Sequence, residues 1–150
     1  AHSRPQPCIS YGRLLSGEGV VAAMDVSDGL AEDLSKLCMA SGVSARVYAA
    51  SIPIHPHLKE AFPKKCLELA LNGGEDYQLL FTAKKELMDS LLPQLGPGAR
   101  VVGEITAGEP GLVTVVGASG TCRDQLVGGY DSLYKLHQSG ELKALLSEKI

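Results

Sequence analysis

Oxygen-bearing side chains cluster in the stretch MDVSDGLAED, residues 24–33. Asp25 stands at the end of an apolar run, and Ser27, Asp28 and Gly29 follow it. If that run is a buried strand, the Asp25 carboxylate emerges at the edge where open α/β sheets bind their ligands. Free N–H groups at the start of the next helix favour an anion, and carboxylate oxygens suit Mg²⁺ that carries a nucleotide phosphate. The alternative is structural: Ser27 or Asp28 caps the helix and Asp25 is solvated.

A second candidate stretch is NGGEDYQLL, residues 72–80. Gly73 and Gly74 can stop a helix, which leaves Glu75 and Asp76 on the loop that enters the next strand. A tight glycine turn can hold a carboxylate in a fixed orientation against a hydroxyl or amine of a ligand. The alternative interpretation is a helix stop followed by an ordinary polar turn.

The third stretch is GGYDSL, residues 128–133, where Tyr130 offers an aromatic face for stacking on a planar ring. An equal alternative is a core tyrosine before a helix that is capped by Asp131. His55 and His57 in IPIHPHL could chelate a metal, but the two prolines of this stretch and the lack of a partner carboxylate nearby favour a loop. No glycine-rich phosphate motif and no hydrolase triad can be assembled, so we predict no catalytic side chain.

The elements that must position these residues follow from hydrophobic periodicity. It predicts strands over 19–26, 43–50, 76–83, 99–106 and 111–118, and helices over 27–42, 56–74 with a break at Pro63, 84–95 and 130–150. Strands interleaved with helices predict the α/β class, an α+β sandwich with one mixed sheet and helices packed against it. Pro5 and Pro7 predict that residues 1–15 form an extended lead-in, with a single domain over 16–150.

Composition excludes several classes of protein. The chain has 150 residues, of which 45% are hydrophobic, and a net charge of −3, which argues against a nucleic-acid-binding surface. No apolar stretch is long enough to span a membrane, and no apolar signal region points to secretion. The four cysteines form no C-x-x-C pair, so we expect reduced thiols and a cytoplasmic protein.

Together and in order, AAMDVSDGLAEDL, NGGEDYQLLFT and GGYDSL resemble the C-terminal half of the thiamine-monophosphate kinase family. The stretch RPQPCISYGRLL matches the family's arginine–proline lead-in, so the resemblance covers roughly residues 4–134. It implies the C-terminal-domain fold of the aminoimidazole ribonucleotide synthetase-like superfamily. It also implies transfer of the ATP γ-phosphoryl to thiamine monophosphate with Mg²⁺, and a homodimer of the full-length protein.

By position, the resemblance implies that Asp25 and Asp28 are Mg²⁺ ligands and that Ser27 binds ATP. Glu75 and Tyr130 correspond to residues that bind the substrate. This assignment suits phosphoryl transfer, which depends on positioning and charge neutralisation more than on a covalent residue.

The sequence departs from the family's pattern at Gln78, where a glutamate is usual, and at Ser132-Leu133, where the family is more aromatic. The family's N-terminal half carries most metal ligands and the nucleotide site. We expect that half to be absent from this chain and the chain alone to be inactive. Two other interpretations stay open: another enzyme of the superfamily, and a stand-alone ligand-binding or regulatory module.

Overall fold

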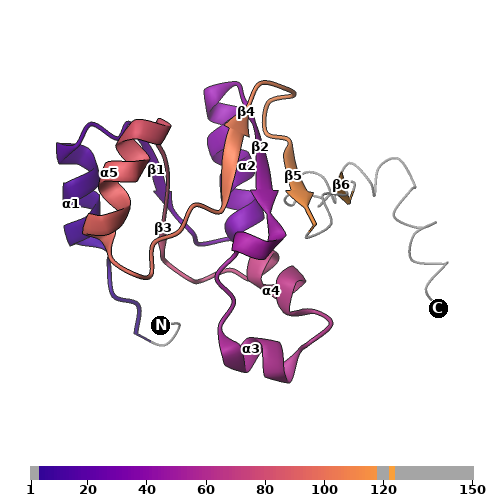
Figure 1. Ribbon diagram of the computed structural model, residues 1–150. Coiled ribbons are helices and arrows are strands. Elements are labelled where there is room, and N and C mark those ends of the chain that lie inside the picture. The colour runs from indigo at the N-terminus through magenta and orange to yellow at the C-terminus, as the bar shows by residue number, and fades with distance from the viewer. Residues whose placement is uncertain (1–3, 118–121, 124–150) are drawn as a thin grey trace.

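The computed structural model describes residues 4–117 and 122–123 (Figure 1). In chain order the elements are α1 (Ile9–Gly17), β1 (Ala22–Asp25), α2 (Leu30–Ser41), β2 (Ser44–Tyr48), the 3₁₀ turn η1 (Ala49–Ser51), α3 (Pro56–Ala61), α4 (Cys66–Asn72), β3 (Leu79–Thr82), α5 (Lys85–Leu95), β4 (Gly103–Thr106), β5 (Val113–Val116) and β6 (Cys122–Arg123). Within the described ranges, no helix combines the length and the apolar character that a membrane crossing requires.

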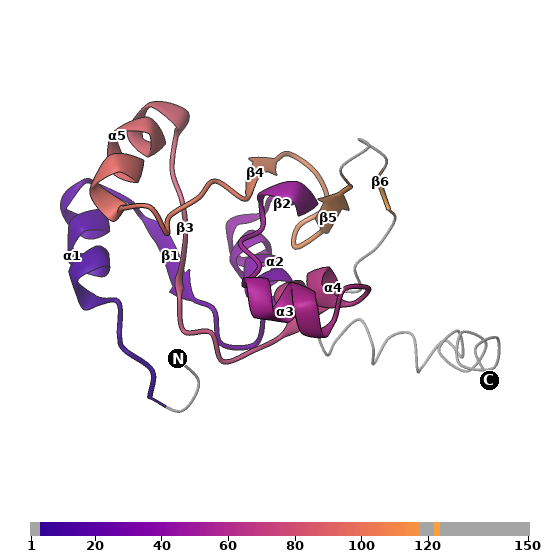
Figure 2. The same cartoon turned by 60° about the horizontal axis from the view of Figure 1, so that its bottom comes forward.

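The strands confirm the α/β class, but they divide between two sheets in the described part of the chain. β1 and β3 form an antiparallel pair, and a four-stranded mixed sheet has the order β4-β2-β5-β6. In that mixed sheet β2 is antiparallel to β4 and parallel to β5. Figures 1 and 2 both show α1 and α5 beside the β1–β3 pair, whereas α2 and α4 lie by the larger sheet. The expected single mixed sheet is therefore split.

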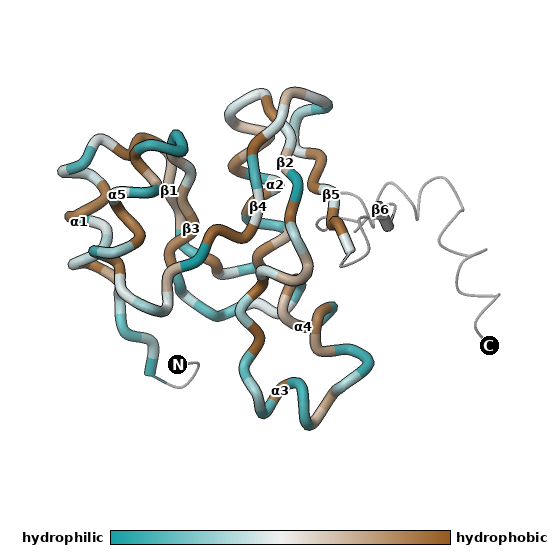
Figure 3. Tube along the Cα trace, viewed as in Figure 1, coloured by the Kyte–Doolittle hydropathy of each residue, from teal (hydrophilic) through white to brown (hydrophobic). Residues whose placement is uncertain are grey.

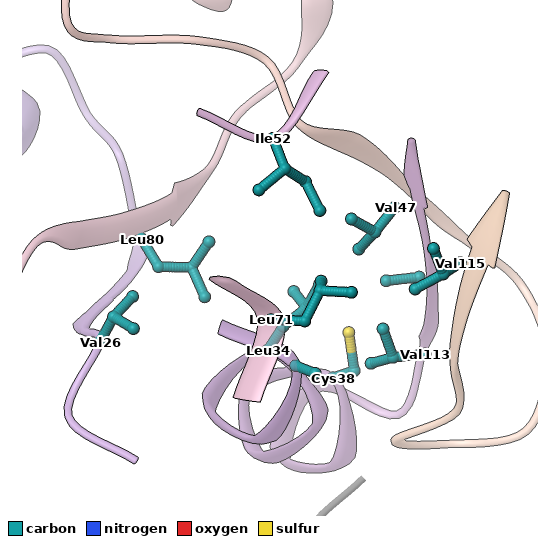
Figure 4. Close-up of a cluster of buried hydrophobic side chains, with 11 residues drawn as sticks. Val26, Leu34, Cys38, Val47, Ile52, Leu71, Leu80, Val113 and Val115 are labelled. Carbon is teal, nitrogen blue, oxygen red and sulfur yellow. The ribbon is translucent and has the colours of Figure 1, made fainter. Parts of the chain in front are cut away.

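The main core lies between α2, α4 and the mixed sheet (Figure 4). Leu34 and Cys38, one helical turn apart on α2, face Val47 of β2 together with Val113 and Val115 of β5. Figure 3 shows that β5 is hydrophobic, as expected of a strand whose Val113 and Val115 are buried in the core. Leu71 at the end of α4 and Val26 after β1 belong to the same cluster. Both stretches that carry candidate site residues are thus anchored on this core.

A smaller cluster holds the other part of the molecule together. Leu15 of α1 packs with Leu91 and Leu95 of α5, and Leu79 and Phe81 of β3 lie against them. The lead-in expected to be extended over residues 1–15 is therefore helical from Ile9 onward. Contacts with α5, which no local pattern reveals, stabilise a helix whose own sequence contains glycines of poor helix propensity.

The remaining helices agree with the periodicity. α2 ends at Gly42, which adopts the left-handed conformation (φ 67°) typical of helix C-termini. The predicted break at Pro63 separates α3 from α4, and α5 occupies the predicted range. The helix predicted over 130–150 lies outside the described residues.

Candidate functional site

The first candidate loop connects β1 to α2. Asp25 is the last residue of β1, as predicted, and its side chain is exposed. The prediction that β1 is a buried strand is wrong, because Ala23 and Asp25 are exposed and alternate with half-buried neighbours. A strand with one open face still delivers the Asp25 carboxylate to the surface beside the start of α2.

The second candidate loop, residues 73–78, lies directly against the first. The Glu75 N–H donates to the Ser27 carbonyl (2.7 Å) and the Tyr77 N–H to the Val26 carbonyl (2.8 Å). In return the Val26 N–H donates to the Gln78 carbonyl at 2.8 Å. These main-chain hydrogen bonds join two stretches that are some fifty residues apart in the chain. The structure therefore brings Asp25, Ser27, Asp28 and Glu75 into one surface region.

Close approach of the two loops explains their glycines. A Cβ atom on Gly74 would lie 2.6 Å from the Ser27 carbonyl oxygen, which is closer than real Cβ contacts. Gly29 has a φ of 123°, and a Cβ there would lie 3.0 Å from the carbonyl carbon of Asn72. Side chains at these two positions would push the loops apart.

Two non-glycine residues of the second loop have left-handed backbone conformations. Glu75 has a φ of 66° and Tyr77 a φ of 52°. Such conformations are uncommon for residues with a Cβ and persist where the surrounding structure fixes them. Here the hydrogen bonds to Val26 and Ser27 supply that constraint. The Glu75 carboxylate is thus presented from a loop of defined shape.

The turn of the first loop is held by Asp33, a residue that the sequence analysis did not single out. Asp33 is buried, with 1% of its side chain exposed, and its Oδ2 accepts the N–H groups of Ser27 (2.8 Å) and Asp28 (2.9 Å). α2 has Gly29 at its N-cap position and no side-chain cap. The alternative in which Ser27 or Asp28 caps the helix is therefore wrong, because the N-cap position belongs to Gly29, which has no side chain.

Lys36 supplies the positive charge of the site. Its Nζ contacts the carboxylates of Asp28, Glu32 (3.3 Å) and Asp33 (3.1 Å). The Asp28 carboxylate, followed by the other two, raises the pKa of Lys36 above its usual value. Burial opposes ionisation of Asp33, but the Asp28 N–H, Lys36 and the Ser27 N–H together lower the pKa of that carboxyl. Asp33 and Lys36 are thus a charged pair at the base of the turn.

The donor set fits a hard cation that is only partly bound by protein. No group of three or more His, Cys, Asp or Glu side chains suited to a metal occurs in the described ranges. Mg²⁺ usually keeps several waters and binds one or two carboxylates plus phosphate oxygens, so two aspartates are compatible with it. Among the described residues the Asp25 carboxylate has no hydrogen-bond or ion-pair partner, whereas Asp28 is paired with Lys36. Asp25 is therefore the more available ligand.

The other candidates contribute little to this region. Tyr130 and Ser132-Leu133 lie outside the described residues. His55 and His57 are exposed, and the loop expected for them is wrong, because Nδ1 of His55 accepts the His57 N–H at 3.3 Å and caps helix α3. His57 lies in that helix, with Nδ1 3.8 Å from the Glu60 carboxylate. Gln78 is also exposed, and its amide donates to the Asp76 carbonyl at 3.2 Å.

Two cavities open near the second loop. The larger, about 640 Å³, is mainly apolar and lies between the facing edges of β3 and β4. A smaller one of about 330 Å³ is lined by Arg4, Pro5, Gln6, Asp76 and Gln78. Asp76 and Gln78 line both cavities, whereas Asp25, Ser27, Asp28 and Glu75 line neither. The candidate site is consequently an exposed pair of loops beside these cavities.

The fold is that of an α/β domain with a mixed sheet and an acidic, glycine-bearing loop pair, and comparison with known proteins specifies its family. The chain belongs to the family described as AIR synthase related protein, C-terminal domain, whose model matches residues 3–116. It is 37% identical over 115 residues to the thiamine-monophosphate kinase of Escherichia coli O157:H7. The matched segment covers 74% of this chain and 35% of that relative.

Solved structures show the same relationship. The structure described as "AaThiL complexed with AMPPCP and TMP" superposes with a TM-score of 0.64 at 34% identity, over 81% of this chain and 37% of that one. Hydrogenase maturation protein HypE in complex with ATP gives a TM-score of 0.63 at 20% identity, over 74% of this chain and 37% of that one. The second likeness shows the fold alone. The chain spans little more than a third of the length of the relatives it matches.

Proposed function

We propose that this chain is the substrate- and metal-binding C-terminal domain of a kinase that phosphorylates thiamine monophosphate to thiamine diphosphate with ATP. The observation that carries the proposal is the joining of the two motif loops through their main chains. The 37% sequence identity to a thiamine-monophosphate kinase supports it. The structural similarity to a protein in complex with TMP and AMPPCP, an ATP analogue, supports it as well.

In this reaction the bond between the γ-phosphorus of ATP and its bridging oxygen breaks, and a phosphate oxygen of the substrate bonds to that phosphorus. Bound Mg²⁺ supplies neutralisation of charge on the transferring group. Asp25, at the end of β1 with an exposed carboxylate, would hold the cation, and Asp28 would join it on leaving Lys36. Ser27 would contact a nucleotide phosphate, and Glu75 the substrate.

Tyr130 is proposed as an aromatic contact of the substrate, and the active protein is proposed to be a homodimer. We also propose that the remainder of a full-length relative supplies further groups, so that these 150 residues alone do not turn over ATP. A cytoplasmic location is proposed on the free thiols of Cys8, Cys38 and Cys66.

The test is a chimera in which this chain replaces the matched segment of the Escherichia coli relative. Formation of thiamine diphosphate is followed with Mg²⁺, ATP and thiamine monophosphate, and the 150-residue chain alone is assayed in parallel. We expect turnover by the chimera and none by the chain alone. A folded chimera that binds neither substrate would contradict the assignment, and turnover by the chain alone would show that the active site is misplaced.

A further inference from the structure

The buried carboxylate of Asp33 is aimed at the turn that carries two of the candidate ligands. Its two oxygens have separate partners: Oδ2 accepts the N–H groups of Ser27 and Asp28, and Oδ1 accepts the Lys36 ammonium at 3.1 Å. The Asp33 N–H donates to the Gly29 carbonyl at 2.9 Å, which fixes the start of the helix. The orientation of this carboxylate is therefore set from both sides.

This arrangement changes what the neighbouring side chains are free to do. In many helices a Ser, Thr, Asp or Asn at the N-cap position uses its own side chain to accept N–H groups of the first helical turn. Here the N-cap residue is Gly29, so neither the Ser27 hydroxyl nor the Asp28 carboxylate caps α2. The main-chain N–H groups of Ser27 and Asp28 are bonded to the Asp33 carboxylate. Asp28 instead extends to Lys36 with 58% of its side chain exposed.

We propose that Asp33 is a positioning residue for the Ser27–Asp28 turn, and that it sets how well this turn binds a divalent cation. The inference rests on the proposed function, because that function gives Asp28 its role as a ligand. Asp33 itself does not reach the ligand, since only 1% of its side chain is exposed. Its effect is transmitted through the two N–H groups. Outer partners of this kind commonly change metal affinity by about 10–100-fold.

The first measurement needs no substitution. Amide hydrogen exchange of the 150-residue chain by NMR should show protected N–H groups at Ser27 and Asp28, although neither lies in a helix or strand. Exchange of both amides at the rate of an unstructured peptide would overturn the proposal, whatever the chain's activity.

The second measurement separates positioning from direct ligation. On addition of MgCl₂, the side-chain carboxyl carbon signal of Asp28 should shift more than that of Asp33. A larger shift at Asp33 would make it a ligand and overturn the positioning role. This comparison uses the wild-type chain, so it stands even where a substituted chain does not fold.

The third measurement uses Asp33→Asn, with Asp89→Asn as the matched control. Asp89 pairs with Lys85 (2.5 Å) and is 61% exposed. Both residues lie on α5, which is beside α1 and away from α2 (Figure 1). Asp33→Asn should lose protection at Ser27 and Asp28 and raise the Kd for Mg²⁺ by about 10-fold or more, whereas Asp89→Asn should change neither.

The outcomes distinguish this inference from the proposed function. A folded Asp33→Asn chain with the wild-type Kd for Mg²⁺ overturns the inference and leaves the metal site standing. A wild-type chain that protects both amides but shows no response of either loop to Mg²⁺ supports the positioning of the turn and contradicts the metal site.

Discussion

The two candidate loops carry similar residues but are held in different ways. The turn at Ser27–Asp28 is fixed by a side chain, the buried carboxylate of Asp33. The loop at residues 73–78 is fixed by main-chain hydrogen bonds and by the absence of a side chain at Gly74. We infer that the first loop is sensitive to changes of charge, and that the second is sensitive to added volume.

The largest effect is expected from Asp25→Asn in the chimera. This change removes a negative charge and a ligand from the proposed cation site, and turnover should fall by about 10²-fold or more. Gln78→Glu should change turnover little, because the Gln78 side chain is exposed and its amide donates to the Asp76 carbonyl of the same loop. Steady-state kinetics at saturating Mg²⁺ measures both, with folding checked by thermal unfolding. Near-normal turnover of a folded Asp25→Asn protein would contradict the metal-ligand role of Asp25, and the first loop would then be an ordinary turn.

Next in size is the effect of Gly74→Ala on stability. The new methyl group would collide with the Ser27 carbonyl, and overpacking of this kind costs about 1–3 kcal/mol. Gly98→Ala is the control, since nothing lies within 4 Å of a Cβ atom at that position. Urea unfolding of the 150-residue chain compares the two. Equal midpoints would show that the loops are not in close contact.

A smaller effect is expected from acid. The pKa of Asp33 is lowered below its usual value of 3.8, so its contribution to stability is present above that pH. The contribution is lost as the pH falls further, through the folded-state value. Lys36 pairs with this carboxylate and also with Asp28 and Glu32, so the comparison must be made between variants. In urea unfolding between pH 6 and pH 3, Asp33→Asn should lose less stability than wild type. Equal losses for the two proteins would contradict a depressed pKa at Asp33.

The smallest change is expected outside both loops. Gly12 lies in α1, and a Cβ atom there meets nothing within 4 Å. Gly12→Ala should therefore stabilise the chain by about 0.4–1 kcal/mol through a less flexible unfolded state. A rise of the thermal midpoint with unchanged Mg²⁺ binding would confirm α1 and separate it from the site. A loss of stability would contradict the helix.

Local patterns predicted the elements that local interactions stabilise. α2, its end at Gly42, and Asp25 at the end of β1 all follow from periodicity and glycine chemistry. Helix α1 was missed because its stability comes from packing of Leu15 against α5. These contacts join residues far apart in the chain, which a local pattern does not reveal.

The sequence predicted which residues form the candidate site, but it did not predict how they are arranged. The sequence identified both loops, but no local signal showed that they pair or that Glu75 and Tyr77 adopt left-handed conformations. The sequence left open a cap by Ser27 or Asp28, because both have side chains that commonly cap helices. Asp33 could have been suspected from its place on α2, three residues before Lys36 and next to Leu34 in the core.

The central claim is that the two loops form one ligand site, with a divalent cation bound by the first loop directly beside the second. Mn²⁺, which shares the oxygen ligands of Mg²⁺, tests it through paramagnetic broadening of NMR signals in the 150-residue chain. At substoichiometric Mn²⁺, the signals of residues 25–29 and 74–76 should broaden together before those of other carboxylate-bearing segments. Broadening that begins at Glu86 and Asp89 of α5, or that affects one loop without the other, would contradict the account.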